Sequence, residues 1–386
     1  MIPYGRHTID QQDIDFVVEV LKSDWLTCGP AIEKFEEELS KMVEAKYAVS
    51  CSNGTTALHL AMLGLEIGIG DTILVPAITF LASANAARYV GADVAFVDVD
   101  PSTGLMTAET LEASILAHKG KNLKAVVNVH LAGQCENLED IYKISKKYNL
   151  YIIEDAAHAI GTVYIDQNKK KHPVGSNAFS DLTTFSFHPV KTIAMGEGGA
   201  VTTNDLKITE KLRSLRSHGM IRNPALWTED QAVGPWYYEM HELGYNYRIS
   251  DINCALGISQ LQKLQQFKLE RAKIVKFYDD SFTNVPHIRP IQKLRHSESA
   301  WHLYIVLIDY CNLKKTRTEV METLKSHGIS TQVHYIPVYK QPYYSKLYGK
   351  MILPGTEKYY QSCLSLPLYI SLKNDQLVSV AKILKS

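Results

Sequence analysis

The feature that most constrains the fold is a regular alternation of strand-like and helix-like segments between residues 47 and 155. Short runs of β-branched and apolar residues are each followed by a segment whose apolar residues recur at helical spacing. The expected strands are 47–52, 73–76, 94–98, 125–130 and 151–155, and the expected helices are 57–65, 82–90, 108–117 and 138–148. Such an alternation predicts an α/β fold of three layers (αβα), with helices on both faces of a mainly parallel sheet.

Helices are also expected before this region, at 8–26 and 31–43, with Gly29-Pro30 as the break between them. A long helix is predicted from Ile252 to Tyr278. The chain beyond it predicts a strand at 301–309, a helix at 314–327, a strand at 330–335 and a helix at 374–384. We place a domain boundary inside the long helix. The prediction is a large domain of residues 1–260 and a smaller C-terminal α+β domain of residues 261–386.

Composition excludes several function classes. With 386 residues, 46% of them hydrophobic, the chain can bury a large core. Basic and acidic residues balance at 41 each, so neither nucleic acid nor a membrane surface is an expected partner. The N-terminus lacks a signal-peptide core and no apolar run is long enough to span a bilayer, so we expect a cytoplasmic protein. The six cysteines form no Cys-x-x-Cys pair, and we expect no metal site and no disulfide.

A lysine after an apolar strand is the first candidate for chemistry. Lys191 follows the strand-like run 182–187, with Ser186 and Pro189 beside it and the glycine-rich loop 196–199 behind it. Most lysines are solvated, because burying an ammonium ion is costly. A desolvated lysine loses its proton more easily and can form a Schiff base with a carbonyl group.

Two carboxylates end the strand at 151–155. Glu154 and Asp155 could belong to a metal site, act as general acid and base, or form a structural network. In parallel sheets, ligands bind beyond the carboxyl ends of the strands. Asp155 and Lys191 on two such ends could hold a pyridinium ring between a carboxylate and an imine. The carboxylate would favour the protonated ring, which is the better electron sink.

The segment Asn53-Gly54-Thr55-Thr56 precedes an expected helix and is a candidate phosphate site. Free N–H groups at a helix start, together with threonine hydroxyls, bind phosphate well. The same pattern is also typical of ordinary helix capping. Dinucleotide-binding and P-loop glycine motifs are absent.

The stretch Pro224–Met240 is rich in aromatic residues and has no clear period. It could be a packed excursion of the chain, or a lid or recognition loop over a site.

Five motifs occur together in an order that resembles the DegT-type sugar-nucleotide aminotransferases. These motifs are Ser-Asn-Gly-Thr-Thr-Ala-Leu from Ser52, Glu-Asp-Ala-Ala-His-Ala from Glu154, Ser-Phe-His-Pro-Val-Lys from Ser186, Gly-Glu-Gly-Gly-Ala-Val from Gly196 and Gly-Tyr-Asn-Tyr-Arg from Gly244. The resemblance extends over nearly the whole chain. It implies the aspartate-aminotransferase fold (fold type I) and pyridoxal 5'-phosphate as cofactor.

The resemblance also implies roles for individual residues. Lys191 would carry the cofactor as an imine and later move a proton between the substrate and the cofactor. Asp155 would pair with the ring nitrogen, and His158 would lie against the ring or its phenolic oxygen. The implied phosphate ligands are Thr55, Thr56 and Ser186, with Asn246 donated by a second subunit.

Three further residues are implied with less direct roles. Phe80 would stack on the ring, and His334 and Tyr335 would contact the substrate. From the residues alone, Phe80 could equally be part of the core, and His158 could be a buried histidine with a backbone partner.

The implied reaction is the amination of a nucleotide sugar by a homodimer with shared active sites. The branch of the family that this chain most resembles transfers nitrogen from L-glutamate to the C4 ketone of a UDP-linked 4-keto-6-deoxy-L-HexNAc sugar. The products are UDP-4-amino-4,6-dideoxy-N-acetyl-L-altrosamine, on the way to pseudaminic acid, and 2-oxoglutarate. The alternatives are an aminotransferase for another keto sugar, either a D-configured UDP sugar or a dTDP sugar, and a non-catalytic regulator on the same scaffold.

Overall fold

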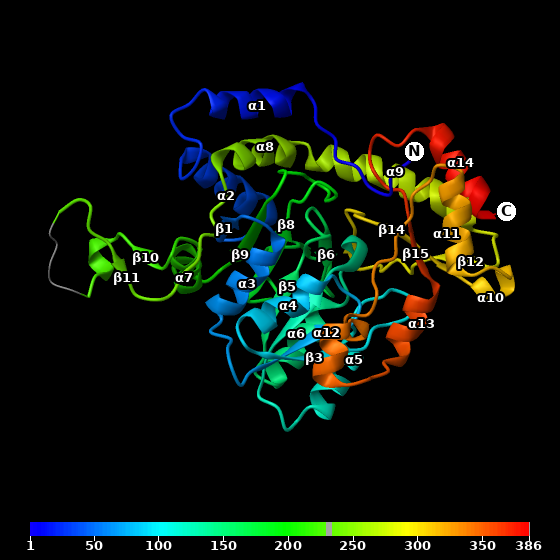
Figure 1. The fold of residues 1–386 in the computed structure, drawn as a ribbon, viewed down its shortest axis with the longest axis horizontal. Helices are drawn as coiled ribbons and strands as arrows, with labels where there is room; N and C mark the ends of the chain where they lie inside the picture. Colours follow the sequence, from blue (N-terminus) through cyan, green and yellow to red (C-terminus); the bar gives the residue numbers. More distant parts are fainter. Residues whose placement is uncertain (229–233, 386) are drawn as a thin grey trace.

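A seven-stranded β-sheet forms the centre of the computed structural model, which describes residues 1–228 and 234–385 (Figure 1). The strand order is β1-β9-β8-β5-β4-β2-β3, with bounds β1 Tyr47–Cys51, β2 Thr72–Pro76, β3 Asp93–Val97, β4 Leu123–Val129, β5 Tyr151–Asp155, β8 Leu182–Ser186 and β9 Gly199–Thr203. Neighbouring strands are parallel except at β9, which runs antiparallel to both β1 and β8. The sheet is therefore mainly parallel, as the alternation predicts.

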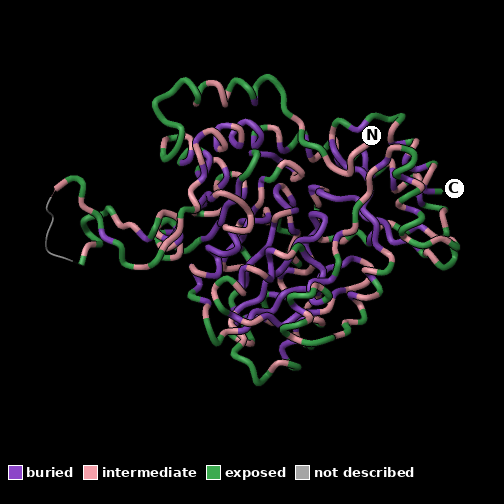
Figure 2. Tube along the Cα trace, viewed as in Figure 1, coloured by how far each residue is buried: buried purple, intermediate pink, exposed green. Residues whose placement is uncertain are grey.

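Helices cover both faces of this sheet, because successive side chains of a strand point to opposite sides. The covering helices are α2 Pro30–Val43, α3 Gly54–Gly64, α4 Leu81–Tyr89, α5 Ala108–Ala117, α6 Leu138–Lys147, α7 Leu206–Arg216 and α8 Asp251–Gln262. On β5, Ile153 is buried in the core that contains α3 and α4, whereas Ile152 is buried with α5 and α6. Figure 2 shows the buried residues gathered along the sheet. The three-layer fold is confirmed.

A second, antiparallel sheet lies near the C-terminus. Its strands are β12 Ile288–Pro290, β14 Tyr304–Ile308 and β15 Cys363–Leu366, and its covering helices are α9 Leu264–Phe282, α11 Arg317–Ser326 and α14 Asn374–Lys385. The chain's N-terminus joins this unit, since the Ile2 N–H donates to the Gly328 carbonyl at 2.6 Å. The boundary between residues 260 and 261 stays a prediction.

The remaining elements lie outside the two main sheets and the helices named above. They are α1 Gln11–Leu21, β6 Val163–Ile165, β7 Lys171–Pro173, β10 Met220–Ile221, β11 Glu239–Met240, β13 Ser297–Glu298, α10 Tyr310–Leu313, α12 Pro342–Tyr348 and α13 Pro354–Ser362, with 3-10 turns at Leu131–Gly133, Pro224–Leu226 and Val338–Lys340. Within the described residues, no helix combines the length and apolar composition needed to cross a membrane.

Two predicted elements are wrong. The long helix 252–278 is two helices, α8 and α9, separated at Lys263, whose ammonium group is held by Asp13 at 2.9 Å and by Asp10. The chain around Lys263 contains no Gly or Pro that would have indicated the break. The predicted strand 330–335 forms only one isolated bridge, between Gln332 and Ser365, because this segment leaves the sheet to line a cavity.

The aromatic-rich stretch forms a projecting arm at the side of the molecule (Figure 1). Strands β10 and β11 pair at its base, and the rings of Trp227 and Tyr237 pack with centroids 4.8 Å apart. Trp236 is 71% exposed, so its ring is not packed against the body of its own chain. Residues 229–233 of the stretch lie outside the described residues, and the lid interpretation stays a prediction.

Candidate active site

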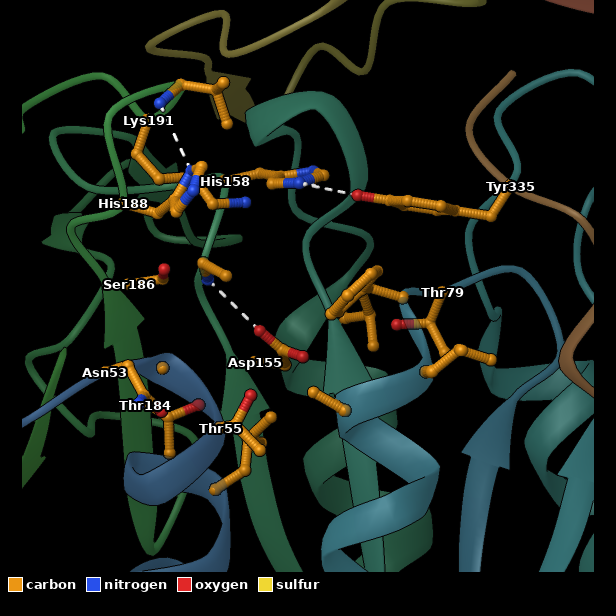
Figure 3. Close-up of a pocket in the computed structure, with 18 of the residues that line it drawn as sticks. Asn53, Thr55, Thr79, Asp155, His158, Thr184, Ser186, His188, Lys191 and Tyr335 are labelled. Carbon is orange, nitrogen blue, oxygen red and sulfur yellow. Dashed lines mark hydrogen bonds between the residues drawn. The ribbon is translucent and has the colours of Figure 1, made fainter. Parts of the chain in front are cut away.

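A cavity of about 950 Å³ lies where β5 and β8 end and where α3 and α4 begin. Figure 3 shows Lys191, His158, Ser186, Thr55 and Asp155 around this space. The structure thus places the lysine, carboxylate and threonine motifs, which are far apart in the sequence, in the wall of one cavity.

Lys191 enters the cavity from a turn after β8. The turn is closed by the Lys191 N–H, which donates to the His188 carbonyl at 2.8 Å. The side chain is half-buried and opens onto the cavity. Burial lowers the pKa of its amine from 10.5 to about 8, against the opposing attraction of the Asp155 carboxylate. At physiological pH, the neutral, nucleophilic form is therefore a larger fraction of Lys191 than of a solvated lysine.

The loop 196–199 returns the chain from β8 into antiparallel β9. Gly196 takes a positive φ of 76°, and a Cβ atom at Gly199 would lie 2.2 Å from the Asn53 carbonyl oxygen. The glycines are thus required by the reversal and by a close approach to the start of α3.

The start of α3 forms a cradle with the end of β8. A Cβ atom at Gly54 would lie 2.7 Å from the Ser186 Cβ, so glycine allows the two backbones to approach closely. The hydroxyl groups of Thr55 and Ser186 make no hydrogen bond to another described residue, and both residues line the cavity. Free N–H groups of a helix start beside two hydroxyls suit a phosphate group.

Thr56 has a different position in this cradle. The Asn53 side chain accepts from the Thr56 N–H at 2.9 Å, and the Thr56 hydroxyl accepts from the Asn53 N–H at 3.1 Å. The Thr56 hydroxyl also donates to the Asn53 carbonyl at 2.8 Å. Thr56 therefore belongs to a capping box. Thr55 and Thr56 both line the cavity, and their binding of a phosphate group stays a prediction.

The two carboxylates at the end of β5 point to opposite faces of the sheet. Glu154 is buried and contacts the Nε2 atom of His130 at 2.6 Å, which makes it part of a structural network. Asp155 lines the cavity, where its Oδ1 accepts from the Ala157 N–H at 3.1 Å and its Oδ2 accepts from the Ser83 hydroxyl at 2.7 Å. Among the described residues, no cluster of three His, Cys, Asp or Glu side chains could hold a metal ion.

His158 connects the backbone to a tyrosine of the cavity wall. Its Nδ1 accepts from the Ala132 N–H at 3.3 Å, which places the imidazole proton on Nε2. Nε2 then donates to the Tyr335 hydroxyl at 3.1 Å (Figure 3). Burial and the nearby Lys191 charge hold the pKa of His158 well below its usual range, so the ring is neutral. His158 therefore has a backbone partner and also lines the cavity, and its contact with the cofactor stays a prediction.

The other predicted residues differ in their relation to the cavity. His334 lines it while its Nδ1 contacts the Ser365 hydroxyl at 2.7 Å. Phe80 lies on the rim with 58% of its side chain exposed, which excludes the interpretation of Phe80 as core. Asn246 is exposed and does not line the cavity of its own chain. A cofactor role for Asn246 therefore requires another subunit and stays a prediction.

Sequence reasoning missed several residues of the site. Tyr4 reaches the cavity from the N-terminus, and His302 lies against His158 with ring centroids 4.3 Å apart. Thr79 and Ser83 lie behind Asp155. The only local signal was the pair of hydroxyl residues Thr79 and Ser83 on the two sides of an expected helix start. Nothing in the sequence near Tyr4 points to a site.

Comparison with known proteins identifies the class of enzyme. The model of the DegT/DnrJ/EryC1/StrS aminotransferase family matches residues 7–385. The chain belongs to this family. It is therefore a sugar aminotransferase, and the predicted family is confirmed.

Similar proteins share this chain's whole length. The UDP-4-amino-4,6-dideoxy-N-acetyl-beta-L-altrosamine transaminase of Campylobacter jejuni is 38% identical, over 98% of this chain and 96% of the relative. The spore coat polysaccharide biosynthesis protein SpsC of Bacillus subtilis is 37% identical, over 98% and 95%. The solved structure of Helicobacter pylori PseC, an aminotransferase involved in the biosynthesis of pseudoaminic acid, aligns with a TM-score of 0.88 at 30% identity, over 99% and 98%.

Members of this family use pyridoxal 5'-phosphate, and the predicted cofactor is confirmed at the level of the family. The cavity residues fit this cofactor. A lysine with a pKa of about 8 can form an imine with its aldehyde. Where Gly54 and Ser186 approach closely, the start of α3 and the hydroxyl groups of Thr55 and Ser186 line the cavity, and such a helix start suits a phosphate group. Asp155 supplies a carboxylate in the wall of the same cavity.

Proposed function

We propose that this aminotransferase moves an amino group from L-glutamate to the C4 ketone of a UDP-linked 4-keto-6-deoxy-L-HexNAc sugar. The products would be UDP-4-amino-4,6-dideoxy-N-acetyl-L-altrosamine and 2-oxoglutarate. The observation that carries the aminotransferase chemistry is the half-buried Lys191, whose pKa is about 8, in one cavity with the Asp155 carboxylate. The Campylobacter jejuni transaminase and Helicobacter pylori PseC support the choice of sugar.

The cofactor-facing residues of the cavity have distinct roles in this proposal. Pyridoxal phosphate, when bound, supplies the electron sink that such a transfer needs. Lys191 binds the cofactor and moves the proton at the carbon that gains or loses nitrogen. Asp155 holds the proton on the ring nitrogen, and Thr55 and Ser186, with the free N–H groups of α3, hold the phosphate.

His158 and Tyr335 complete the wall against which the substrate would lie. Because His158 Nε2–H donates to the Tyr335 oxygen, the proton of the Tyr335 hydroxyl is available to an acceptor in the cavity. Burial raises the pKa of Tyr335, so the hydroxyl stays protonated and able to donate. A sugar or cofactor oxygen is a suitable acceptor. His334 forms the neighbouring part of this wall.

The proposal includes a homodimer. Asn246 does not line the cavity of its own chain, which supports a model in which it reaches the cofactor phosphate of a second copy. The phosphate site of each subunit would then be completed by its partner, so that the active sites lie at the subunit interface.

An aminotransferase for a different keto sugar is the second candidate. The Bacillus subtilis spore coat polysaccharide protein is as similar in sequence as the altrosamine transaminase, at 37% against 38% identity. Overall identity therefore does not by itself select the altrosamine pathway over spore coat polysaccharide biosynthesis.

A substrate panel tests the proposal. The purified enzyme is incubated with L-glutamate and, separately, with UDP-4-keto-6-deoxy-L-HexNAc, its D-configured isomer and dTDP-keto sugars. The mass change of ketone to amine is followed together with release of 2-oxoglutarate. The Lys191→Ala variant is the control and should give neither. Amination of the L-configured UDP sugar with the highest kcat/KM supports the proposal, whereas preference for another sugar replaces it with the second candidate.

A further inference from the structure

Two buried hydroxyl groups are linked to the Asp155 carboxylate by hydrogen bonds, and the more distant one, that of Thr79, belongs to a residue that also lines the cavity. Ser83, in the first turn of α4, is fully buried and its Oγ lies 2.7 Å from Asp155 Oδ2. Thr79, in the connection between β2 and α4, is 2% exposed, and its Oγ1 lies 2.7 Å from Ser83 Oγ. The reaction proposed above uses neither of these residues.

The proton count fixes the direction of this chain of hydrogen bonds. A carboxylate only accepts, and a serine hydroxyl has a single proton, so Ser83 must donate that proton to Asp155. Ser83 can then only accept from Thr79, and Thr79 must be the donor of the second hydrogen bond. The order is Thr79 to Ser83 to Asp155, and each bond strengthens the next by polarisation.

The Ser83 hydroxyl holds the second oxygen of the Asp155 carboxylate and so fixes the plane of the group. Asp155 Oδ1 is held by the backbone N–H of Ala157, whereas Oδ2 is held by a side chain of a different element, α4. Two donors from separate parts of the fold leave the carboxylate little freedom to rotate. Hydrogen bonds to a charged oxygen are also stronger than those between neutral groups.

We propose that Ser83 and Thr79 are positioning residues that aim Asp155 at the ring nitrogen of the cofactor and keep its charge in place. The proposal rests on the assignment of Asp155 to that nitrogen, but not on the identity of the sugar or the amino donor. Without the Ser83 donor, the carboxylate turns more freely, and the proton shared with the ring nitrogen moves toward Asp155.

The test uses the apoenzyme and two readouts that do not depend on turnover. The dissociation constant for pyridoxal phosphate is measured by titration, and the protonation of the ring nitrogen by NMR of 15N-labelled cofactor. Ser83→Ala should weaken cofactor binding about tenfold or more and move the nitrogen signal toward the unprotonated form. Thr79→Val keeps the side-chain shape and leaves the hydrogen bond from Ser83 to Asp155 in place, but it removes the one from Thr79 to Ser83. It should change both readouts in the same direction as Ser83→Ala, but by a smaller amount.

Ser145→Ala is the matched control. Ser145 is a fully buried serine of α6 whose hydroxyl has no hydrogen-bond partner among the described residues. This variant should leave both readouts at the wild-type values, and thermal unfolding of each apoenzyme shows that the variants are folded.

Three outcomes would overturn the inference. Wild-type affinity and an unchanged nitrogen signal in folded Ser83→Ala would do so directly. If Ser83→Ala does not fold, unchanged readouts in Thr79→Val overturn it, and the graded change expected of that variant supports it. An unchanged nitrogen signal in Asp155→Asn would overturn both the assignment of Asp155 and the positioning roles. The sugar panel can fail while these readouts behave as expected, which separates this inference from the proposed substrate.

Discussion

The Lys191 amine should lose its proton with a pKa of about 8, far below the value of 10.5 for a solvated lysine. Its reactivity should therefore rise with pH around that value. Burial disfavours the charged ammonium form, and the nearby Asp155 carboxylate only partly offsets this effect. At pH 7, about a tenth of Lys191 is then unprotonated, against about one part in 3,000 for an ordinary lysine. The neutral amine is therefore about 300 times more abundant.

Stopped-flow mixing of apoenzyme with saturating pyridoxal phosphate measures this directly. The rate of imine formation, followed by its visible absorbance, should rise with pH and level off above a midpoint near 8. The same reaction with Nα-acetyl-lysine, whose ε-amine is free, corrects for ionisation of the cofactor itself. The Lys191→Ala variant should give no specific imine signal.

The Asp155→Asn variant sharpens the test. The negative charge of Asp155 raises the pKa of Lys191, so its removal should move the midpoint below 8. A wild-type midpoint near 10, or an upward shift in Asp155→Asn, would refute the reasoning that burial activates this lysine.

Two further predictions follow from the same site. The folded-state pKa of Lys191 lies below its unfolded value, so the unfolded chain binds more protons between pH 8 and 10.5 and apoenzyme stability should rise with pH across that window. At pH 7 the buried ammonium group of Lys191 lowers the free energy of unfolding, and Lys191→Met removes this group. The variant apoenzyme should be more stable than wild type at pH 7 by at most about 3 kcal/mol, as measured by urea denaturation. A destabilised variant would contradict this prediction. For the dimer, mixing inactive Lys191→Ala with impaired Asn246→Ala subunits should restore about a quarter of wild-type activity, because each mixed dimer holds one intact site. No recovery after subunit exchange would argue against shared sites.

Much of this fold could be predicted from local patterns in the sequence. The alternation from residue 47 to residue 155 predicted the parallel sheet and its two helical layers, because strand and helix periods are properties of short segments. The motifs around Thr55, Asp155 and Lys191 could be found for a related reason. Each lies next to a strand end or helix start, and such ends meet at one edge of a parallel sheet.

The errors arose where distant parts of the chain decide local structure. Lys263 breaks a helix without any Gly or Pro, in contact with Asp10 and Asp13, which are about 250 residues away in sequence. The segment 330–335 has the composition of a strand but lines the cavity. In both places the local preference was overridden by tertiary contacts.

The sequence by itself determined the fold class, the family and the three motifs that meet at the cavity, because each of these depends on the order of residues within short segments. Only the tertiary structure decided that Asp155 faces the cavity while Glu154 pairs with His130, and that Ser83 donates to Asp155. The strand order places β5 between β4 and β8, and the packing of α4 on one face selects which carboxylate meets which partner. These two pairings join residues that are 24 and 72 positions apart in the sequence, and no local period encodes them.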